Sequence, residues 1–199
     1  MEARKEKIGL FGGSFDPIHT GHLILAEAAV NVAGLARVIF IPTAIPPHKR
    51  DIPLTDIETR ARMVELAIGE NPRFELSRIE ASRGVSYTYR TVRAFAARGY
   101  GKEEIHLLVG GDMLEEMAEW RKPGEIFSRA TVLVMLRPGH ARIPALPPEA
   151  ALICMTAGAN AISSRSIRAL VREGKSIRYL VPEAIERFIA AHSLYRPGI

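Results

Sequence analysis

The feature that most constrains this chain is the stretch of residues 8–22, IGLFGGSFDPIHTGH, close to the start of the sequence. It opens with an apolar run that has the length of a buried strand, and Gly12-Gly13 then permits a turn whose backbone angles are closed to other residues. A long apolar helix begins near Thr20. A strand, a glycine turn and a helix N-terminus together form an anion site, because free N–H groups and the positive end of the helix dipole point the same way. The stretch therefore predicts a site for a nucleotide phosphate.

Two histidines stand at the start of that helix. His19 and His22 are three residues apart, so their side chains are expected on nearly one face. Ser14 and Asp16 lie in the same stretch, and together with the histidines they favour contact with a phosphate. Histidines at this spacing could also chelate a metal ion, but the sequence places no third ligand nearby, and we predict no metal site.

The rest of the chain alternates between strand-like apolar runs and helical periodicity. Strands are predicted at residues 38–41, 74–79, 104–109, 130–136 and 152–155, and longer helices at 21–33, 57–70, 91–98, 163–173 and from 182 onward. This alternation predicts an α/β protein with a single Rossmann-like, doubly wound parallel sheet, helices on both faces and a small C-terminal helical segment. We expect one domain over residues 1–199.

Ligands of doubly wound sheets bind at the carboxyl ends of the strands, near the point where the strand order reverses. In this chain that edge would gather residues 12–22, 42–49 and 110–112 and the segment before Ser163.

Composition narrows the choice of partners. The chain has 27 Lys and Arg against 22 Asp and Glu, a net charge of +5, which admits nucleic acid, an acidic membrane surface or small phosphorylated ligands. Like charges do not form long runs, and aromatic residues make up only 7% and are dispersed, which disfavours a nucleic-acid-binding module. Small anionic ligands account for the charge equally well.

The sequence also indicates a compartment. No apolar run reaches the roughly 18 residues of a membrane span, and residues 1–7 lack the apolar region of a signal peptide. The only cysteine, Cys154, excludes an internal disulfide framework and fits a reducing cytoplasm. We expect Cys154 to be a small buried apolar group.

Two motifs carry a family resemblance. GSFDPIHTGH resembles the (T/H)xGH signature of the nucleotidyltransferase superfamily, and ISSRSIR at 162–168 resembles its second signature, of the form ISSTxIR. Between them stand PPHK at 46–49, SYT at 86–88, GGDM at 110–113, Trp120 and RPG at 137–139. In this order and spacing the chain resembles the bacterial nicotinate-nucleotide adenylyltransferases over nearly its whole length. One departure is Arg165, which stands where the second signature usually has threonine.

The resemblance implies an enzyme of NAD biosynthesis that joins ATP, with Mg²⁺, to nicotinate mononucleotide and forms deamido-NAD and pyrophosphate. The mononucleotide phosphate would attack the α-phosphorus of ATP in line. Such a reaction needs two mutually repelling anions to be aligned and the developing charge to be neutralised, and it needs no nucleophilic serine or cysteine. Cations, N–H donors and Mg²⁺ would do this work.

The resemblance also assigns the ATP side. His19 and His22 would contact the ATP phosphates, with His22 on the β/γ side. Ser164 and Arg168 are four residues apart and thus on one face of a helix start, where a second anion site would hold the β/γ-phosphates. His19, His22 and Arg168 are the predicted catalytic residues. The predicted ATP-binding residues are Gly12, Gly13, Ser14, Phe15, His19, His22, Ser163, Ser164 and Arg168.

Five further residues are assigned to the acceptor mononucleotide. Lys49 would contact its phosphate, and Asp112, after a strand and two glycines, would accept from ribose hydroxyls. Trp120 would stack on the pyridine ring, while the backbone N–H groups of Tyr87 and Thr88 would meet the nicotinate carboxylate. Each has an ordinary alternative: Lys49 could be solvated, Asp112 could cap a helix and Trp120 could belong to the core.

Alternative functions remain open at this point. The acceptor could be nicotinamide mononucleotide or another phosphorylated compound, although phosphopantetheine adenylyltransferases usually carry threonine where His19 stands. The chain could also be a non-catalytic nucleotide-binding protein on the same fold. We expect small-molecule partners, no nucleic acid and no membrane, with a homo-oligomer left open.

Overall fold

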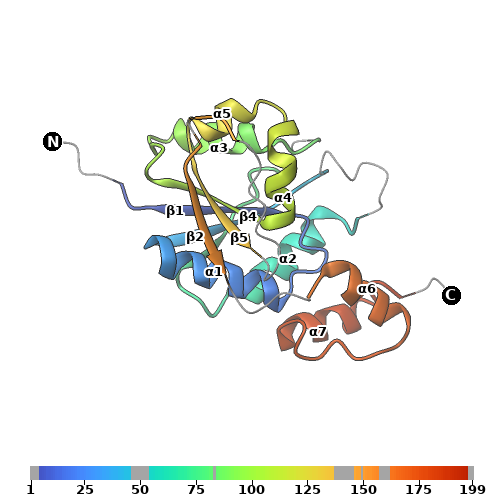
Figure 1. Cartoon of the computed structure of the whole chain (residues 1–199). Helices are drawn as coiled ribbons and strands as arrows, with labels where there is room; N and C mark the ends of the chain where they lie inside the picture. Colours follow the sequence, from blue (N-terminus) through green and yellow to red (C-terminus); the bar gives the residue numbers. More distant parts are fainter. Residues whose placement is uncertain are drawn as a thin grey trace.

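The computed structural model describes residues 5–45, 54–82, 84–136, 146–148, 150–156 and 162–196. At its centre is a six-stranded sheet in the order β3-β2-β1-β4-β5-β6, in which every neighbouring pair is parallel (Figure 1). The strands are β1 (Ile8–Gly13), β2 (Arg37–Pro42), β3 (Phe74–Leu76), β4 (Ile105–Gly110), β5 (Thr131–Leu136) and β6 (Leu152–Thr156). The order reverses between β1 and β4, so the predicted doubly wound sheet is confirmed.

Helices cover both faces of the sheet, as predicted (Figure 1). The helices are α1 (Thr20–Ala33), α2 (Ile57–Ile68), α3 (Thr88–Ala96), α4 (Gly111–Glu116), the 3₁₀ helix η2 (Met117–Glu119), α5 (Pro123–Phe127), α6 (Ser164–Arg172) and α7 (Glu183–Ala191). Buried side chains of α1, α2, α6 and α7 share one hydrophobic cluster, and those of α3 and α5 share the other.

The strands serve both clusters because their side chains alternate between the faces of the sheet. In β2, Val38 and Phe40 belong to the cluster with α1 and α2, while Ile39 and Ile41 belong to the cluster with α3 and α5. A strand that is buried on both faces reads as a continuous apolar run, which is why its sequence lacks polar alternation.

The ends of the helices follow local sequence signals. The side chain of Asp56 caps α2 by accepting a hydrogen bond of 2.9 Å from the backbone N–H of Thr59. Gly34 ends α1 with φ 62°, a left-handed angle that glycine adopts without a steric penalty. Pro182 precedes α7, as expected for a residue that cannot extend a helix toward its N-terminus.

The C-terminal helical segment, α6 and α7, packs beside α1 and α2 rather than forming a separate layer (Figure 1). Ile167 of α6 and Ile185 and Ile189 of α7 are buried in the cluster that α1 and α2 share. This packing brings the second sequence motif back to the first.

Three local predictions differ from the structure. The predicted strand at 74–79 ends at Leu76, and the predicted helix at 91–98 begins three residues earlier, at Thr88. The prediction that Cys154 is buried is wrong, because Cys154 is exposed. It lies in β6 at the edge of the sheet, and since side chains alternate along a strand, its neighbour Met155 takes the buried position.

Candidate active site

A cavity of about 1050 Å³ lies at the carboxyl ends of the central strands. Gly12 and Gly13 line it at the end of β1, Thr43 after β2, and Gly110 at the end of β4. These strands flank the point where the strand order reverses, which is the place that a doubly wound sheet offers to a ligand. The lining also includes His19, His22, Glu80, Tyr87, Thr88, Trp120, Ser163, Ser164, Arg165 and Arg168.

The turn after β1 is shaped by Phe15. This residue has φ 46°, in the left-handed region, and its ring is 1% exposed. A Cβ atom on Gly13 would lie 2.9 Å from Phe15 Cζ, so the turn needs glycine at that position. The cavity lining includes Gly12, Gly13 and Ser14 but not Phe15. The Phe15 ring therefore supports the turn from the core, and the contact of its backbone with ATP stays a prediction.

The two histidines form one unit at the start of α1. Their rings are stacked, with centroids 3.6 Å apart and planes 24° from parallel. The backbone N–H of His19 donates to Nδ1 of His22 over 3.2 Å. Because that Nδ1 is an acceptor, the proton of a neutral His22 ring is on Nε2.

Burial keeps both rings neutral at pH 7. It lowers the pKa of His19 to about 4, and it lowers the pKa of His22 well below the usual value, with a further contribution from the neighbouring His19. The ring of His22 packs against Phe11 and Phe15, with centroids 5.8 and 5.0 Å away. The pair can thus offer N–H donors to a phosphate, while positive charge must come from elsewhere.

The start of α6 supplies that charge and docks on the first motif. Ser163 caps the helix, since its Oγ accepts from the backbone N–H of Ser166 over 3.1 Å. Ser164 Oγ donates to the carbonyl of Pro17 over 2.9 Å, and Arg168 Nη1 donates to the carbonyl of Asp16 over 2.6 Å. The two motifs, about 140 residues apart, therefore meet at one wall of the cavity.

The other end of the cavity is built by the start of α3 and by the segment around Trp120. Tyr87 is the N-cap residue of α3 and Thr88 its first residue, so backbone N–H groups at a helix N-terminus face this region. Trp120 is half-buried and lines the cavity. The Arg121 guanidinium lies 4.9 Å from the centroid of the Tyr87 ring.

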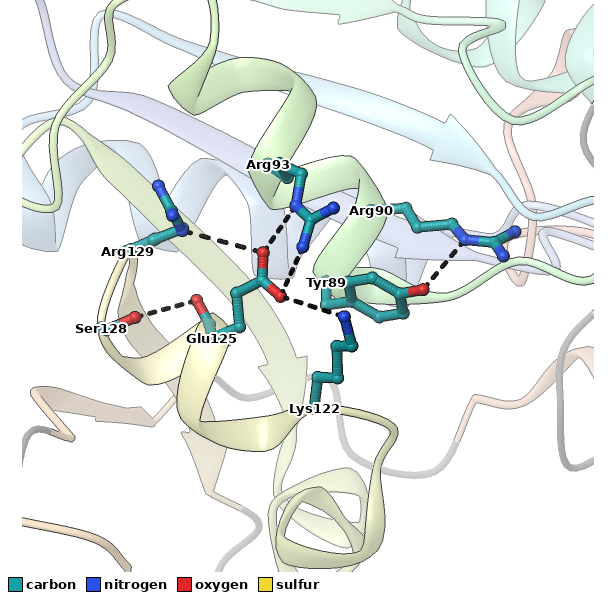
Figure 2. Close-up of polar contacts among 7 residues, drawn as sticks. All are labelled: Tyr89, Arg90, Arg93, Lys122, Glu125, Ser128 and Arg129. Atoms are coloured by element: carbon teal, nitrogen blue, oxygen red, sulfur yellow. Dashed lines mark hydrogen bonds and ion pairs between the residues drawn. The ribbon is translucent and has the colours of Figure 1, made fainter.

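A cluster of charged side chains joins α3 to α5 outside the cavity lining (Figure 2). Glu125 accepts two hydrogen bonds from Arg93, of 2.6 and 2.8 Å, and lies 3.9 Å from both Lys122 and Arg129. The Arg93 hydrogen bond holds the pKa of Glu125 below its usual value. Glu125 is thus shared by three cations, Arg93, Lys122 and Arg129.

Two predicted acceptor residues cannot be placed in full. Lys49 lies outside the described residues. Asp112 lies in α4, directly after Gly110 and Gly111 at the end of β4, but its side chain is outside the described part of the structure.

Arg60 is a residue of this region that our sequence analysis missed. Its side chain is 1% exposed, and it donates to the carbonyls of Thr55 (2.7 Å), Ser14 (2.7 Å), Thr43 (2.8 Å) and Ala44 (3.3 Å). Burial lowers the pKa of Arg60, whereas the negative charge of the nearby Asp16 acts in the opposite direction and raises it. A signal was present, because position 60 lies one turn before Val64 on the apolar face of the helix.

Glu80 and Thr91 were missed as well. Both are buried and line the cavity, and the Thr91 hydroxyl donates to Oε1 of Glu80. Within the described residues, five buried side-chain atoms have no hydrogen-bond partner, and four of them belong to residues of the cavity wall: His19 Nδ1, Thr43 Oγ1, Glu80 Oε2 and Trp120 Nε1. Because buried polar atoms are normally paired, this concentration marks the cavity as a site for a polar ligand.

Comparisons with known proteins found similar sequences over nearly the whole chain. The Cytidylyltransferase-like family matches residues 10–170. A "Probable nicotinate-nucleotide adenylyltransferase" of Moorella thermoacetica is 42% identical, covering 100% of this chain and 96% of that protein. The protein of the same name from Thermus thermophilus is also 42% identical, covering 96% of this chain and 100% of the relative.

Among solved structures, the "Plasmodium falciparum nicotinic acid mononucleotide adenylyltransferase complexed with NaAD" superposes with a TM-score of 0.78 at 16% identity, covering 96% of this chain and 98% of that one. A putative nicotinate-nucleotide adenylyltransferase from Vibrio parahaemolyticus gives a TM-score of 0.70 at 19% identity, covering 98% of each chain. At these identities the likeness is one of fold.

Proposed function

Because the chain belongs to the nicotinate-nucleotide adenylyltransferase family, we propose that it transfers the adenylyl group of ATP to nicotinate mononucleotide, giving deamido-NAD and pyrophosphate. The observation that carries the proposal is the meeting of two helix N-termini at one cavity: α1 brings His19 and His22, and α6 brings Ser164 and Arg168. Two such termini with an arginine between them suit a triphosphate.

In this proposal the protein aligns the reactants and stabilises charge. The ATP phosphates lie over the start of α1, where Nε2–H of the neutral His22 donates to them. Arg168 balances the negative charge that grows on the leaving pyrophosphate, and α6 adds the positive end of its dipole. The mononucleotide phosphate attacks the α-phosphorus in line, the bond to the β-phosphate oxygen breaks, and pyrophosphate leaves.

The acceptor occupies the opposite end of the cavity. The backbone N–H groups of Tyr87 and Thr88 receive the nicotinate carboxylate, and the pyridine ring stacks on Trp120. Lys49 contacts the acceptor phosphate, and Asp112 accepts from the ribose hydroxyls. The Arg121 guanidinium, which lies against the Tyr87 ring and lines the cavity, suits an acceptor that is an anion.

Mg²⁺ enters the proposal as part of the ATP substrate. Among the described residues no group of three or more His, Cys, Asp or Glu side chains could hold a metal ion. We place the reaction in the cytoplasm, which the single cysteine of the sequence favours. No helix among the described residues has the length and apolar character of a membrane span.

The proposal is tested by release of pyrophosphate from ATP and Mg²⁺ with a panel of acceptors: nicotinate mononucleotide, nicotinamide mononucleotide and phosphopantetheine. We expect the highest kcat/KM with nicotinate mononucleotide and deamido-NAD as its product. A higher kcat/KM with another member of the panel would overturn the choice of acceptor. No release with any of them would point to the non-catalytic alternative.

A further inference from the structure

The segment that follows α7 reaches back to the turn between β1 and α1. The hydroxyl of Tyr195 donates a hydrogen bond of 2.6 Å to Oδ1 of Asp16, although the two residues are 179 positions apart. Asp16 is 2% exposed, so this contact is made away from water. Tyr195 is not among the residues that line the cavity, and its hydrogen bond to Asp16 connects it to the first motif.

Asp16 is a junction of three segments. Besides Tyr195 on Oδ1, its Oδ2 accepts from the backbone N–H of Thr55 over 3.3 Å, just before α2. Its own carbonyl accepts from Arg168 of α6 over 2.6 Å. The adjoining carbonyl of Pro17 accepts from Ser164. A shift of Asp16 would therefore move the backbone on which the two α6 residues of the ATP site are docked.

The hydrogen bond between Tyr195 and Asp16 is supported by the packing around Tyr195. Tyr195 has φ 63°, a left-handed angle that a bulky residue rarely adopts, so the packing around it must hold it there. Its ring packs against the hydrophobic cluster of α1, α2 and α7, and its hydroxyl lies 4.0 Å from Sδ of Met63. Burial raises the pKa of Tyr195, and the negative charge of Asp16 raises it further. The hydroxyl therefore keeps its proton, and remains a donor, over the pH range of an enzyme assay.

We propose that Tyr195 is a positioning residue for adenylyl transfer: it holds Asp16, and through the carbonyls of Asp16 and Pro17 it sets where Arg168 and Ser164 meet the ATP phosphates. This inference rests on the proposed function, since it concerns the alignment of reactants in the same cavity. By this inference the segment after α7 contributes to the reaction, although Tyr195 does not line the cavity.

The test is Tyr195→Phe, which removes one oxygen and keeps the ring. The kcat and the KM for ATP and for nicotinate mononucleotide are measured at a temperature where circular dichroism shows both proteins fully folded. We expect kcat to fall about tenfold while each KM changes less than about threefold, because substrates still bind but are aligned less well. A purely structural role would lower the melting temperature and leave kcat per folded molecule unchanged.

The matched control is Tyr179→Phe. Tyr179 is 83% exposed, and its contact with the start of α1 uses its backbone carbonyl, which accepts from the Thr20 hydroxyl over 3.2 Å and survives the substitution. We expect kcat within twofold of the unsubstituted chain. An equal loss of kcat in Tyr179→Phe and Tyr195→Phe would overturn the inference, because the effect would then not be specific to the Asp16 contact.

A second variant, Asp16→Asn, tests the same hydrogen bond in case Tyr195→Phe folds poorly. Asp16→Asn keeps the shape and an acceptor oxygen but removes the charge that strengthens the bond, and it should lower kcat with little change in either KM. A kcat within twofold of the unsubstituted chain in the variant that folds would overturn the inference. If instead the unsubstituted chain releases no pyrophosphate with any acceptor, the proposed function fails, and the two failures are distinguished.

Discussion

At the scale of the residue, the site works with uncharged histidines. His19 and His22 are stacked at 3.6 Å, and burial holds both pKa values low, so a phosphate meets N–H donors there rather than imidazolium cations. A neutral donor costs less to keep buried than a cation would when no ligand is bound. The charge that attracts the phosphates is then left to the helix dipoles and Arg168.

Replacement of His22 by alanine should cut turnover strongly and leave the fold intact. The loss of one preorganised donor to a developing oxyanion typically lowers kcat by about 100-fold or more. Steady-state kinetics with ATP and nicotinate mononucleotide measures this, with His192→Ala, an exposed histidine after α7, as the control. Near-normal turnover in His22→Ala would contradict the phosphate assignment.

The low pKa of His19 predicts a loss of stability in acid. Below the unfolded pKa of 6.5 the unfolded chain binds a proton at this residue, while the folded chain binds one only below about 4. The unfolded state therefore holds more protons across this window, and the free energy of unfolding falls as the pH drops from about 6.5 to about 4, by up to about 3 kcal/mol from this residue.

Urea denaturation at several pH values would show this effect. His19→Gln should flatten the dependence of the unfolding free energy on pH in this window. Some slope would persist in His19→Gln, because burial also lowers the pKa of His22 and of His106. Identical slopes in His19→Gln and the unsubstituted chain would refute the argument.

At the scale of the element, α2 is more than a cover for the sheet. Arg60 on its first turn donates to carbonyls just after β1, after β2 and before α2 itself, and so joins residues 43–44 to residue 55. A planar guanidinium can do this because it holds several N–H donors in a fixed fork. Three segments of the described structure are thus held by one buried side chain.

Arg60→Met should destabilise the protein by about 3–5 kcal/mol, because methionine fills the space but leaves buried carbonyls without a donor. Chemical denaturation with a two-state fit measures the change. The matched control is Arg62→Met, two residues along the same helix, where the exposed pair with Glu65 is worth less than about 1 kcal/mol. Equal losses in the two variants would show that the carbonyl contacts of Arg60 do not matter.

At the scale of the whole molecule, different helices form the two ends of the cavity. The two helix N-termini of α1 and α6 stand at one end, and the start of α3 with Trp120 stands at the other. Only a sheet whose order reverses between β1 and β4 leaves both groups at the same edge. A two-substrate reaction can therefore be divided between the ends, and each end can be tested separately.

Trp120→Ala should raise the KM for nicotinate mononucleotide about tenfold and that for ATP less than about twofold, since stacking on a base is worth about 1–3 kcal/mol. Trp120→Phe keeps an aromatic face and should recover most of the lost affinity. The measurement is KM for each substrate at saturating levels of the other. Equal increases in both values would indicate that Trp120 serves the core instead.

The sequence by itself determined whatever depends on neighbours along the chain. Residues 8–22 predicted a strand, a glycine turn and a helix start, and the spacing of Ser164 and Arg168 predicted one face of a helix start. The alternation of strands and helices predicted a doubly wound sheet, and the order of its strands confirms it. These predictions succeed because periodicity, capping and turn chemistry are local properties.

Only the tertiary structure decided contacts between distant residues. Arg60 finds its carbonyls on three segments, Tyr195 reaches Asp16 across 179 positions, and Cys154 is exposed because β6 is the edge strand. No local pattern encodes such pairings, since a buried polar side chain is stable only where the fold brings it a partner. The phosphate turn that the sequence predicts is thus held in place by residues whose part in it appears only when the chain is folded.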